Sequence, residues 1–252
     1  MNSVKESRLN DEAQFQNSRV LSDEPEARGK YYLLLKGAFK HYETELEQVE
    51  GKTIVVVGCS DAGVIPLARK GANVIGVDVA DQAVAKLNQD ILVQQLSGKA
   101  KALVMDAEEL TFEPDSIDMV VCSGVLHHLD VEKAIHTFKR VLKPDGALVM
   151  MEPLEWSPAA YIYRKLTPSM RSEFEHPLVP RDFDLLERNF KEVKWSAYAL
   201  LSCVFIPLII LPGMRGLKES AVEVGGRVDR WLFRHFPFLK YFAWTSVIVC
   251  RK

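Results

Sequence analysis

The sequence lacks the usual marks of a metal-binding or disulfide-linked protein. Its four cysteines are scattered and form no Cys-x-x-Cys pair, so we expect reduced thiols, with neither a disulfide nor a zinc site. Among the six histidines only His127 and His128 are adjacent, so the sequence predicts no metal-ligand cluster. An excess of one charge is lacking too. The 32 basic and 34 acidic residues leave a net charge of −2, which gives no reason to expect a nucleic-acid partner.

Two phosphate-binding signatures are also missing. The chain contains neither the G-x-G-x-x-G of dinucleotide-binding domains nor the GK[ST] of a P-loop. The polar N-terminus, MNSVKESRLNDEAQFQNS, has no apolar stretch of the kind that a signal peptide needs, so we expect a cytoplasmic protein. Residues 195–214 carry no charge, but two prolines and a glycine interrupt them, so we do not expect them to span a membrane.

A regular alternation of strand-like and helical segments is present instead. Apolar, strand-like runs lie at residues 53–57, 73–78, 101–105, 117–122 and 146–151, and two more are expected at 192–199 and 244–250. Helical patterns lie between them at 63–70, 80–96 and 131–142. Such alternation predicts an α/β fold, a doubly wound, Rossmann-like and mostly parallel sheet with helices on both faces.

The expected organisation is one large domain behind an N-terminal segment. Residues 1 to about 27 are polar and are expected to be loose or short-helical, and 27–49 read as an amphipathic helix. The domain proper then covers 50–252. It contains two insertions, 153–180 and 200–243, and just after the first of them Asp182 is a candidate helix cap.

Glycines and acids follow the ends of the first three predicted strands. Gly58 and Gly63 flank the turn after the first strand, where glycine lets backbone N–H groups approach a ligand. Asp78 ends the second strand, where a carboxylate can bind both hydroxyls of a ribose. Asp106 follows the third strand and can accept a hydrogen bond from an exocyclic amine. Without a pyrophosphate motif, an adenosine ligand fits this pattern best.

Four stretches carry a resemblance to a known family: VVVGCSDAGVIPLARKGANVIGVDVA, LVMDAEEL, SIDMVVCSGVLHHLD and AIHTFKRVLKPDGALVMMEP. With them the chain resembles the class I S-adenosylmethionine-dependent methyltransferases, especially the ubiquinone/menaquinone-biosynthesis-like small-molecule branch, methyltransferase type 11. The resemblance implies a seven-stranded sheet with an antiparallel last strand. It also implies S-adenosyl-L-methionine as cofactor and methyl transfer as the activity.

The resemblance implies a set of cofactor contacts. Asp78 would hold the ribose hydroxyls, and Ser123 would lie on the loop beneath the sulfonium. The full set implied is Gly58, Cys59, Ser60, Gly63, Asp78, Val79, Asp106, Ala107 and Ser123. Two positions depart from the family pattern: Val56 stands where an acid is usual, and Ser60 where the middle glycine is usual. A non-catalytic, cofactor-binding partner subunit therefore stays open as an alternative.

Candidate catalytic residues lie just beyond the fourth and fifth strands. His127 and His128 follow the fourth strand, and histidine is the side chain suited to remove a proton near neutral pH. Glu152 ends the fifth strand and is a second kind of candidate base. A structural role is the alternative for each of the three, and O-, N- and C-methylation all stay open.

The acceptor is expected to be a small molecule bound by the N-terminal helix and the two insertions. Candidate acceptor contacts are Tyr31, Tyr32, Arg164, Arg171 and His176. The insertion 200–243 interleaves aromatic and basic residues, which suits an apolar or lipid-like substrate, a peripheral membrane contact, a helical cap or a homodimer interface. A further alternative is methylation coupled to cyclisation of an isoprenoid.

Overall fold

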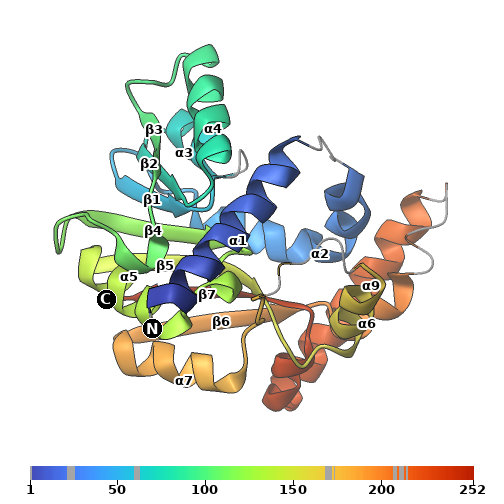
Figure 1. Ribbon diagram of the computed structural model, residues 1–252. Coiled ribbons are helices and arrows are strands. Elements are labelled where there is room, and N and C mark those ends of the chain that lie inside the picture. The colour runs from blue at the N-terminus through green and yellow to red at the C-terminus, as the bar shows by residue number, and fades with distance from the viewer. Residues whose placement is uncertain are drawn as a thin grey trace.

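The computed structural model describes residues 2–21, 26–59, 63–167, 172, 174–206, 209, 213 and 215–252 (Figure 1). They contain one seven-stranded sheet of order β3-β2-β1-β4-β5-β7-β6. The strands are β1 (Thr53–Val57), β2 (Asn73–Asp78), β3 (Ala100–Val104), β4 (Ile117–Ser123), β5 (Leu142–Pro153), β6 (Glu192–Tyr198) and β7 (Thr245–Arg251). The first five strands are parallel, and β7 is antiparallel to both β5 and β6. The predicted Rossmann-like sheet with an antiparallel last strand is confirmed.

Helices cover both faces of the sheet (Figure 1). The helices before β5 are α1 (Asn2–Leu21), α2 (Glu26–Glu45), α3 (Val64–Arg69), α4 (Asp81–Val93) and α5 (Val131–Val141). The later ones are α6 (Pro158–Leu166), α7 (Pro180–Asn189) and α9 (Arg215–His235). Short 3₁₀ helices are η1 (Ala107–Glu109), η2 (Leu126–His128), η4 (Leu201–Phe205) and η5 (Pro237–Phe242). No helix among the described residues has the length and apolar character to cross a lipid bilayer.

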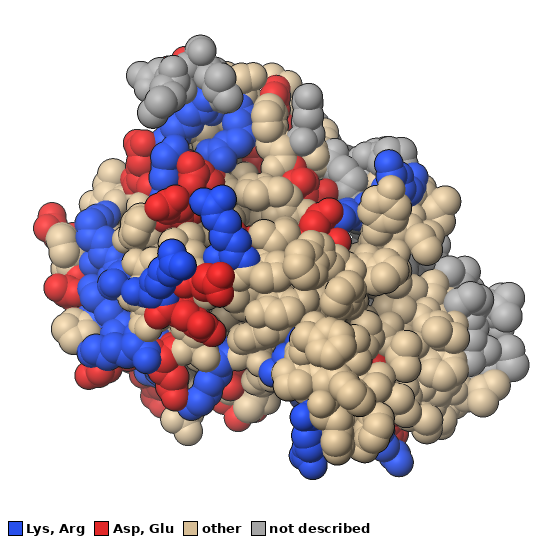
Figure 2. All heavy atoms as spheres, turned by 90° about the horizontal axis from the view of Figure 1, so that it is seen from below, with Lys and Arg blue, Asp and Glu red and all other residues tan. Residues whose placement is uncertain are grey.

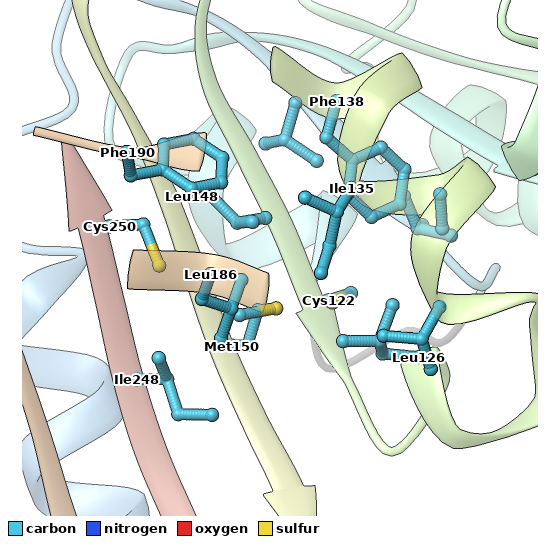
Figure 3. Close-up of a cluster of buried hydrophobic side chains, with 14 of the residues drawn as sticks. Cys122, Leu126, Ile135, Phe138, Leu148, Met150, Leu186, Phe190, Ile248 and Cys250 are labelled. Atoms are coloured by element: carbon cyan, nitrogen blue, oxygen red, sulfur yellow. The ribbon is translucent and has the colours of Figure 1, made fainter. Parts of the chain in front are cut away.

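Strand residues alternate between two buried clusters because successive side chains point to opposite faces. Val55 and Val57 of β1 face α5 and α7, whereas Ile54 and Val56 face α3 and α4. Figure 3 shows part of the first cluster, in which Phe138 and Ile135 of α5 lie on the β4 side of β5 and Leu186 of α7 lies beside β5 and β7. All four cysteines are free thiols, as expected, and three of them are buried.

Two details of the expected secondary structure are wrong, and a third is confirmed. Residues 2–21 form one continuous helix, α1, rather than a loose segment. β5 begins at Leu142 rather than residue 146, because Leu142 pairs with Ile117 before a shift in register. The capping role of Asp182 is confirmed: it lies in the first turn of α7, and its Oδ2 accepts the backbone N–H of the N-cap residue Val179 at 2.9 Å, as in a capping box.

Candidate active site

The carboxyl ends of the parallel strands meet at one edge of the sheet. The backbone N–H of Gly58 donates to the Val77 carbonyl at 2.9 Å, and that of Met105 donates to the Asp78 carbonyl at the same distance. On the other side of β1, the N–H of Gly124 donates to the Met151 carbonyl at 2.8 Å. Ligands bind at this edge in open α/β sheets, where the strand order reverses.

Gly58 is required by both conformation and space. Its φ is +89°, a backbone conformation that residues with a Cβ atom rarely adopt. A Cβ atom at this position would lie 2.8 Å from Cγ2 of Val125, on the loop after β4. The backbone of β1 therefore approaches that loop closely at its end. The candidate Gly63 caps the start of α3, and Ser60 lies outside the described residues.

The carboxylate of Asp78 is oriented by backbone N–H groups and can accept further hydrogen bonds. Its Oδ2 accepts the N–H of Cys59 at 2.8 Å, and its Oδ1 accepts the N–H of Ala80 at 2.9 Å. A carboxylate offers about four acceptor positions, so these two hydrogen bonds leave room for a pair of hydroxyls. Burial raises the pKa of Asp78 in spite of the two N–H donors, so further donors would stabilise the ionised form. A ribose fits this arrangement. Val79, beside it, is half-buried.

Asp106 already has partners on both carboxylate oxygens. Its Oδ1 accepts the N–H of Glu108 at 2.8 Å and so caps η1, and its Oδ2 lies 2.8 Å from Nζ of Lys5. Ala107, expected at the adenine edge, is buried, whereas Ser123 at the end of β4 is exposed. Binding of an exocyclic amine by Asp106 would therefore compete with Lys5.

Glu152 is enclosed by the loop that carries the two histidines. Its side chain is fully buried, and its Oε1 accepts the N–H groups of Val125 and Leu126 at 3.0 and 2.9 Å. Its Oε2 lies 2.7 Å from Nδ1 of His127. The other ring nitrogen of His127, Nε2, lies 3.1 Å from Oε1 of Glu175. Glu152 thus orients the histidine loop, and His127 is held between two carboxylates.

This environment fixes the charge of His127. Burial disfavours the imidazolium, but the hydrogen bonds to Glu152 and Glu175 outweigh it and raise the pKa of His127 to about 9. Burial likewise opposes ionisation of Glu152, yet the hydrogen bond from His127 holds the pKa of that carboxyl below its usual value. At neutral pH, His127 is therefore a cation between two anions and already carries the proton that a general base would have to accept.

His128 has different neighbours. Its Nδ1 lies 2.9 Å from Oγ of Ser172 and 3.3 Å from Oε2 of Glu12, and its ring centroid is 4.2 Å from that of His127. Ligand atoms of His127, His128 and Glu175 lie within 4.8 Å of one another, but His127 would have to lose its proton before this set could bind a cation. The absence of a metal, expected from the sequence, stays a prediction.

Comparison with known proteins finds a methyltransferase domain in this chain. Residues 55–150 match a family model described as a methyltransferase domain. The ubiquinone biosynthesis O-methyltransferase of Pseudomonas aeruginosa (strain UCBPP-PA14) is 28% identical over 163 residues, which cover 59% of this chain and 64% of that enzyme. Residues 55–150 therefore resemble the methyltransferase domain of the class I S-adenosylmethionine-dependent methyltransferases. The chain spans just under two thirds of that relative's length.

Two solved structures of related fold can be aligned with most of the chain. Geranyl diphosphate C-methyltransferase from Streptomyces coelicolor A3(2), in complex with Mg²⁺, geranyl diphosphate and S-adenosyl-L-homocysteine, has a TM-score of 0.65 and 13% identity. That alignment covers 97% of this chain and 98% of the other. The [4+2]-cyclase SpnF has a TM-score of 0.58 and 16% identity, over 86% of this chain and 81% of the cyclase. This fold is therefore shared with enzymes of more than one activity.

Helix α1 lies across the strand-end edge and contacts several parts of it (Figure 1). Lys5 forms ion pairs with Asp106 and Glu109, and Arg8 pairs with Glu108. Further along the helix, Glu12 contacts His128, and Nδ2 of Asn17 donates to Asp81 at the start of α4 at 2.9 Å. The sequence analysis missed these contacts. The one available signal was the i, i+3, i+7 spacing of Lys5, Arg8 and Glu12, which places them on one side of a helix.

The candidate acceptor residues do not form one cluster. Tyr32 is 49% exposed and stacks on Phe39 of its own helix, at 5.1 Å between ring centroids, rather than reaching into the site. His176 is exposed, although its backbone N–H donates to the His127 carbonyl at 2.8 Å. The side chain of Tyr31 and all of Arg171 lie outside the described residues.

Arg164, a candidate contact for the methyl acceptor, has a buried N–H group without a hydrogen-bond partner among the described residues. Its Nη2 lies 2.9 Å from Oε2 of Glu155, while its Nη1 is buried and has no hydrogen-bond partner among the described residues. A buried donor without a partner is costly, so a polar group of a ligand would stabilise it. Arg164 therefore keeps its place as a candidate contact for the acceptor.

Proposed function

We propose that this chain binds S-adenosyl-L-methionine and transfers its methyl group to a small-molecule acceptor that is apolar or lipid-like. The observation that carries the proposal is the Asp78 carboxylate, which is oriented by two backbone N–H groups and lies beside Gly58 at the strand-end edge. The histidine loop follows β4, which is paired directly with β1. One edge thus combines a nucleoside-binding group with titratable side chains.

The protein's own residues would hold and align the reactants. The cofactor supplies an activated methyl group, so the remaining task is alignment and exclusion of water, which can contribute about 7–11 kcal/mol to lowering a barrier. Asp78 would accept the ribose hydroxyls, and the backbone at Gly58 would face the methionine part. Asp106 and Ala107 would meet the adenine once Lys5 is displaced. Helix α1, which contacts both Asp106 and the histidine loop, would exclude water from the closed site.

The two histidines are assigned different roles. His127 carries a proton at neutral pH and both its ring nitrogens face carboxylates, so it would orient its loop rather than contact the acceptor. His128 is then the candidate general base for an oxygen or nitrogen nucleophile. Glu152 is a positioning residue, because both its oxygens are engaged by the loop and by His127. Whether oxygen, nitrogen or carbon is methylated stays open.

An apolar acceptor is supported by the surroundings of the site and by the relatives. The insertions that adjoin the edge expose many large apolar side chains, among them Trp156 and Tyr161. The relative from Pseudomonas aeruginosa takes its name from ubiquinone biosynthesis, and the structure from Streptomyces coelicolor contains geranyl diphosphate. Both names refer to prenylated compounds. Cyclisation coupled to methylation is a second candidate, favoured by the likeness to the [4+2]-cyclase SpnF.

A transfer assay tests the proposal. The purified chain is incubated with S-adenosyl-L-methionine carrying a labelled methyl group and with fractions of lipid-soluble and water-soluble small molecules, and products are identified by mass. We expect label in a lipid-soluble product that gains one methyl group, and much less with His128→Ala. A changed skeleton would favour the cyclisation alternative. Cofactor binding without transfer to either fraction would favour the non-catalytic subunit.

A further inference from the structure

Helix α9 presents an apolar stripe to the surface. Leu217, Val224, Val228 and Trp231 are spaced by seven, four and three residues, which places them along one side of a helix. Each of the four side chains is more than 40% exposed. A surface helix normally turns its polar side outward, so this stripe is unusual for a helix that covers a domain.

The opposite side of α9 is fixed against the domain. A Cβ atom on Gly225 would lie 2.8 Å from Cβ of Ser202, so the helix approaches η4 closely there. Asp229 is buried and accepts the N–H groups of Leu200 and Leu201 at 3.0 and 2.8 Å. Phe233, one turn further, is buried in the main core cluster. The stripe therefore cannot turn inward without breaking these contacts.

Aromatic residues extend the stripe beyond α9. The ring of Trp231 lies 6.4 Å from that of Phe236, which lies 6.5 Å from that of Phe238 at the start of η5. Trp156 packs at the other end of η5, 5.8 Å from Phe242. We call these exposed residues together the apolar face: Trp156, Leu217, Val224, Val228, Trp231, Phe236 and Phe238.

Charged side chains are sparse on one part of the surface. Figure 2 shows a broad uncharged surface on the side of the molecule that carries α6 and α9, and charged side chains crowded on the other side. Contiguous exposed apolar surface of this kind marks an interaction site. The nearby α6 adds three more exposed apolar side chains, Tyr161, Ile162 and Leu166.

A row of arginines borders the apolar face. Arg227, Arg230 and Arg234 are exposed, and two of them follow Val224 and Trp231 by three residues, which places them beside the stripe. Residues 213–240 contain six basic and three acidic residues, a net charge of +3 in a chain whose total is −2. One of those acids, Asp229, is buried on the other side of the helix. Arg227 is paired with Glu223 at 2.7 Å, so the net positive charge of the border comes from Arg230 and Arg234.

We propose that the apolar face docks on the surface of an anionic lipid bilayer. Trp231, Phe236 and Phe238 would lie at the boundary between headgroups and acyl chains, and the arginine row would contact lipid phosphates. The charge selects this occupant. A second copy of the chain in a symmetric dimer would meet the face with the same arginine row, whereas anionic lipid complements both the stripe and its border. The proposal does not depend on the proposed methyl transfer.

Vesicle co-sedimentation of the full chain tests this docking. We expect the chain to sediment with vesicles of phosphatidylcholine and phosphatidylglycerol, weakly with phosphatidylcholine alone, and less as salt is raised. The double variant Trp231→Glu/Phe238→Glu should partition at least tenfold less. The control is Leu92→Glu/Val93→Glu, at side chains of α4 that are 67% and 72% exposed outside the face, and it should partition as the wild type does. Arg230→Gln/Arg234→Gln should lose the preference for anionic vesicles.

Two outcomes would overturn the proposal. One is equal sedimentation of the wild type and the Trp231→Glu/Phe238→Glu variant. The other is no sedimentation of the wild type, together with a dimer in solution that the same variant converts to monomer, which would assign the face to a second copy. Thermal unfolding and S-adenosyl-L-methionine titration of each variant check that it is folded. Since the face lies outside the cofactor edge, the double variant should keep cofactor affinity.

Discussion

The cofactor side and the acceptor side of the site are built from different kinds of sequence. On the cofactor side, Gly58, Asp78 and Asp106 each follow a strand end, and fewer than fifty residues separate the first from the last. The proposed acceptor side depends on contacts of the histidine loop with Glu12 of α1 and with Glu175, which lie about 116 and 48 residues away in the sequence. The cofactor side can be recognised from a pattern in the sequence, whereas the proposed acceptor side is formed by residues that only folding brings together.

The difference extends to the interactions that hold each side. Backbone N–H groups orient Asp78, and φ at Gly58 sets the turn, so the cofactor side depends on the strands themselves. On the proposed acceptor side, charged side chains hold the parts together, from the pair of His127 and Glu152 to the pair of His128 and Glu12 of α1. We therefore expect pH and salt to affect the acceptor side more strongly than the cofactor side. The following predictions test that contrast.

The largest effect is expected for Glu152→Gln. The change leaves the buried His127 cation without one of its two carboxylates, and breaking a buried pair in this way costs about 3–5 kcal/mol of unfolding free energy. Denaturant unfolding measures it. The matched control is Glu155→Gln, which removes a partly exposed pair with Arg164 and should cost less than about 1 kcal/mol. Equal losses for the two variants would show that the buried pair contributes nothing special.

Gly58→Ala should damage the cofactor side specifically. A side chain at φ +89° costs about 1–2 kcal/mol, and the added Cβ atom would also collide with Val125. We expect that loss of stability together with at least tenfold weaker binding of S-adenosyl-L-methionine. Gly51→Ala separates the two causes, because Gly51 has φ +73° but open space around it. If Gly51→Ala weakens cofactor binding equally, the close approach at Gly58 is not the reason.

The pH dependence of stability should reveal the charge of His127. Its pKa is about 9 in the folded chain and about 6.5 in the unfolded chain, so folding binds the proton more tightly. The stabilisation is then complete below about pH 6.5 and is lost as pH rises through about 9. Thermal unfolding from pH 6 to 10 should show this fall in the wild type and a flatter profile in His127→Gln. Parallel profiles would mean that His127 is neutral in the folded chain.

The smallest effect is expected for Lys5→Ala. Its ion pairs are partly exposed, so their loss should change stability by less than about 1 kcal/mol. The same change frees an oxygen of Asp106, so we expect a few-fold higher affinity for S-adenosyl-L-methionine by calorimetry. Lys86→Ala, at an exposed position of α4, should change neither quantity. Weaker binding in Lys5→Ala would mean that Lys5 helps to hold the cofactor.

The sequence predicted those parts of the molecule whose structure depends on residues close together in the chain. The strands of the sheet and the residues at their ends could be read because alternating burial and turn residues are local signals. Helix α1 was not predicted as one helix, because ion pairs to η1 and to the histidine loop hold it rather than an apolar stripe. The contact of Glu175 with His127 spans 48 residues, so no local pattern could reveal it. For α9, the sequence revealed the mixture of aromatic and basic residues, but it could not predict which side of the helix faces outward.

The central claim is that Asp78 belongs to a working cofactor site, and calorimetric titration with S-adenosyl-L-methionine tests it most directly. We expect micromolar binding to the wild type, at least tenfold weaker binding to Asp78→Ala, and unchanged binding to Asp184→Ala, an exposed aspartate on α7. No binding by the folded wild type, or equal binding by Asp78→Ala, would contradict the assignment of this edge to the cofactor.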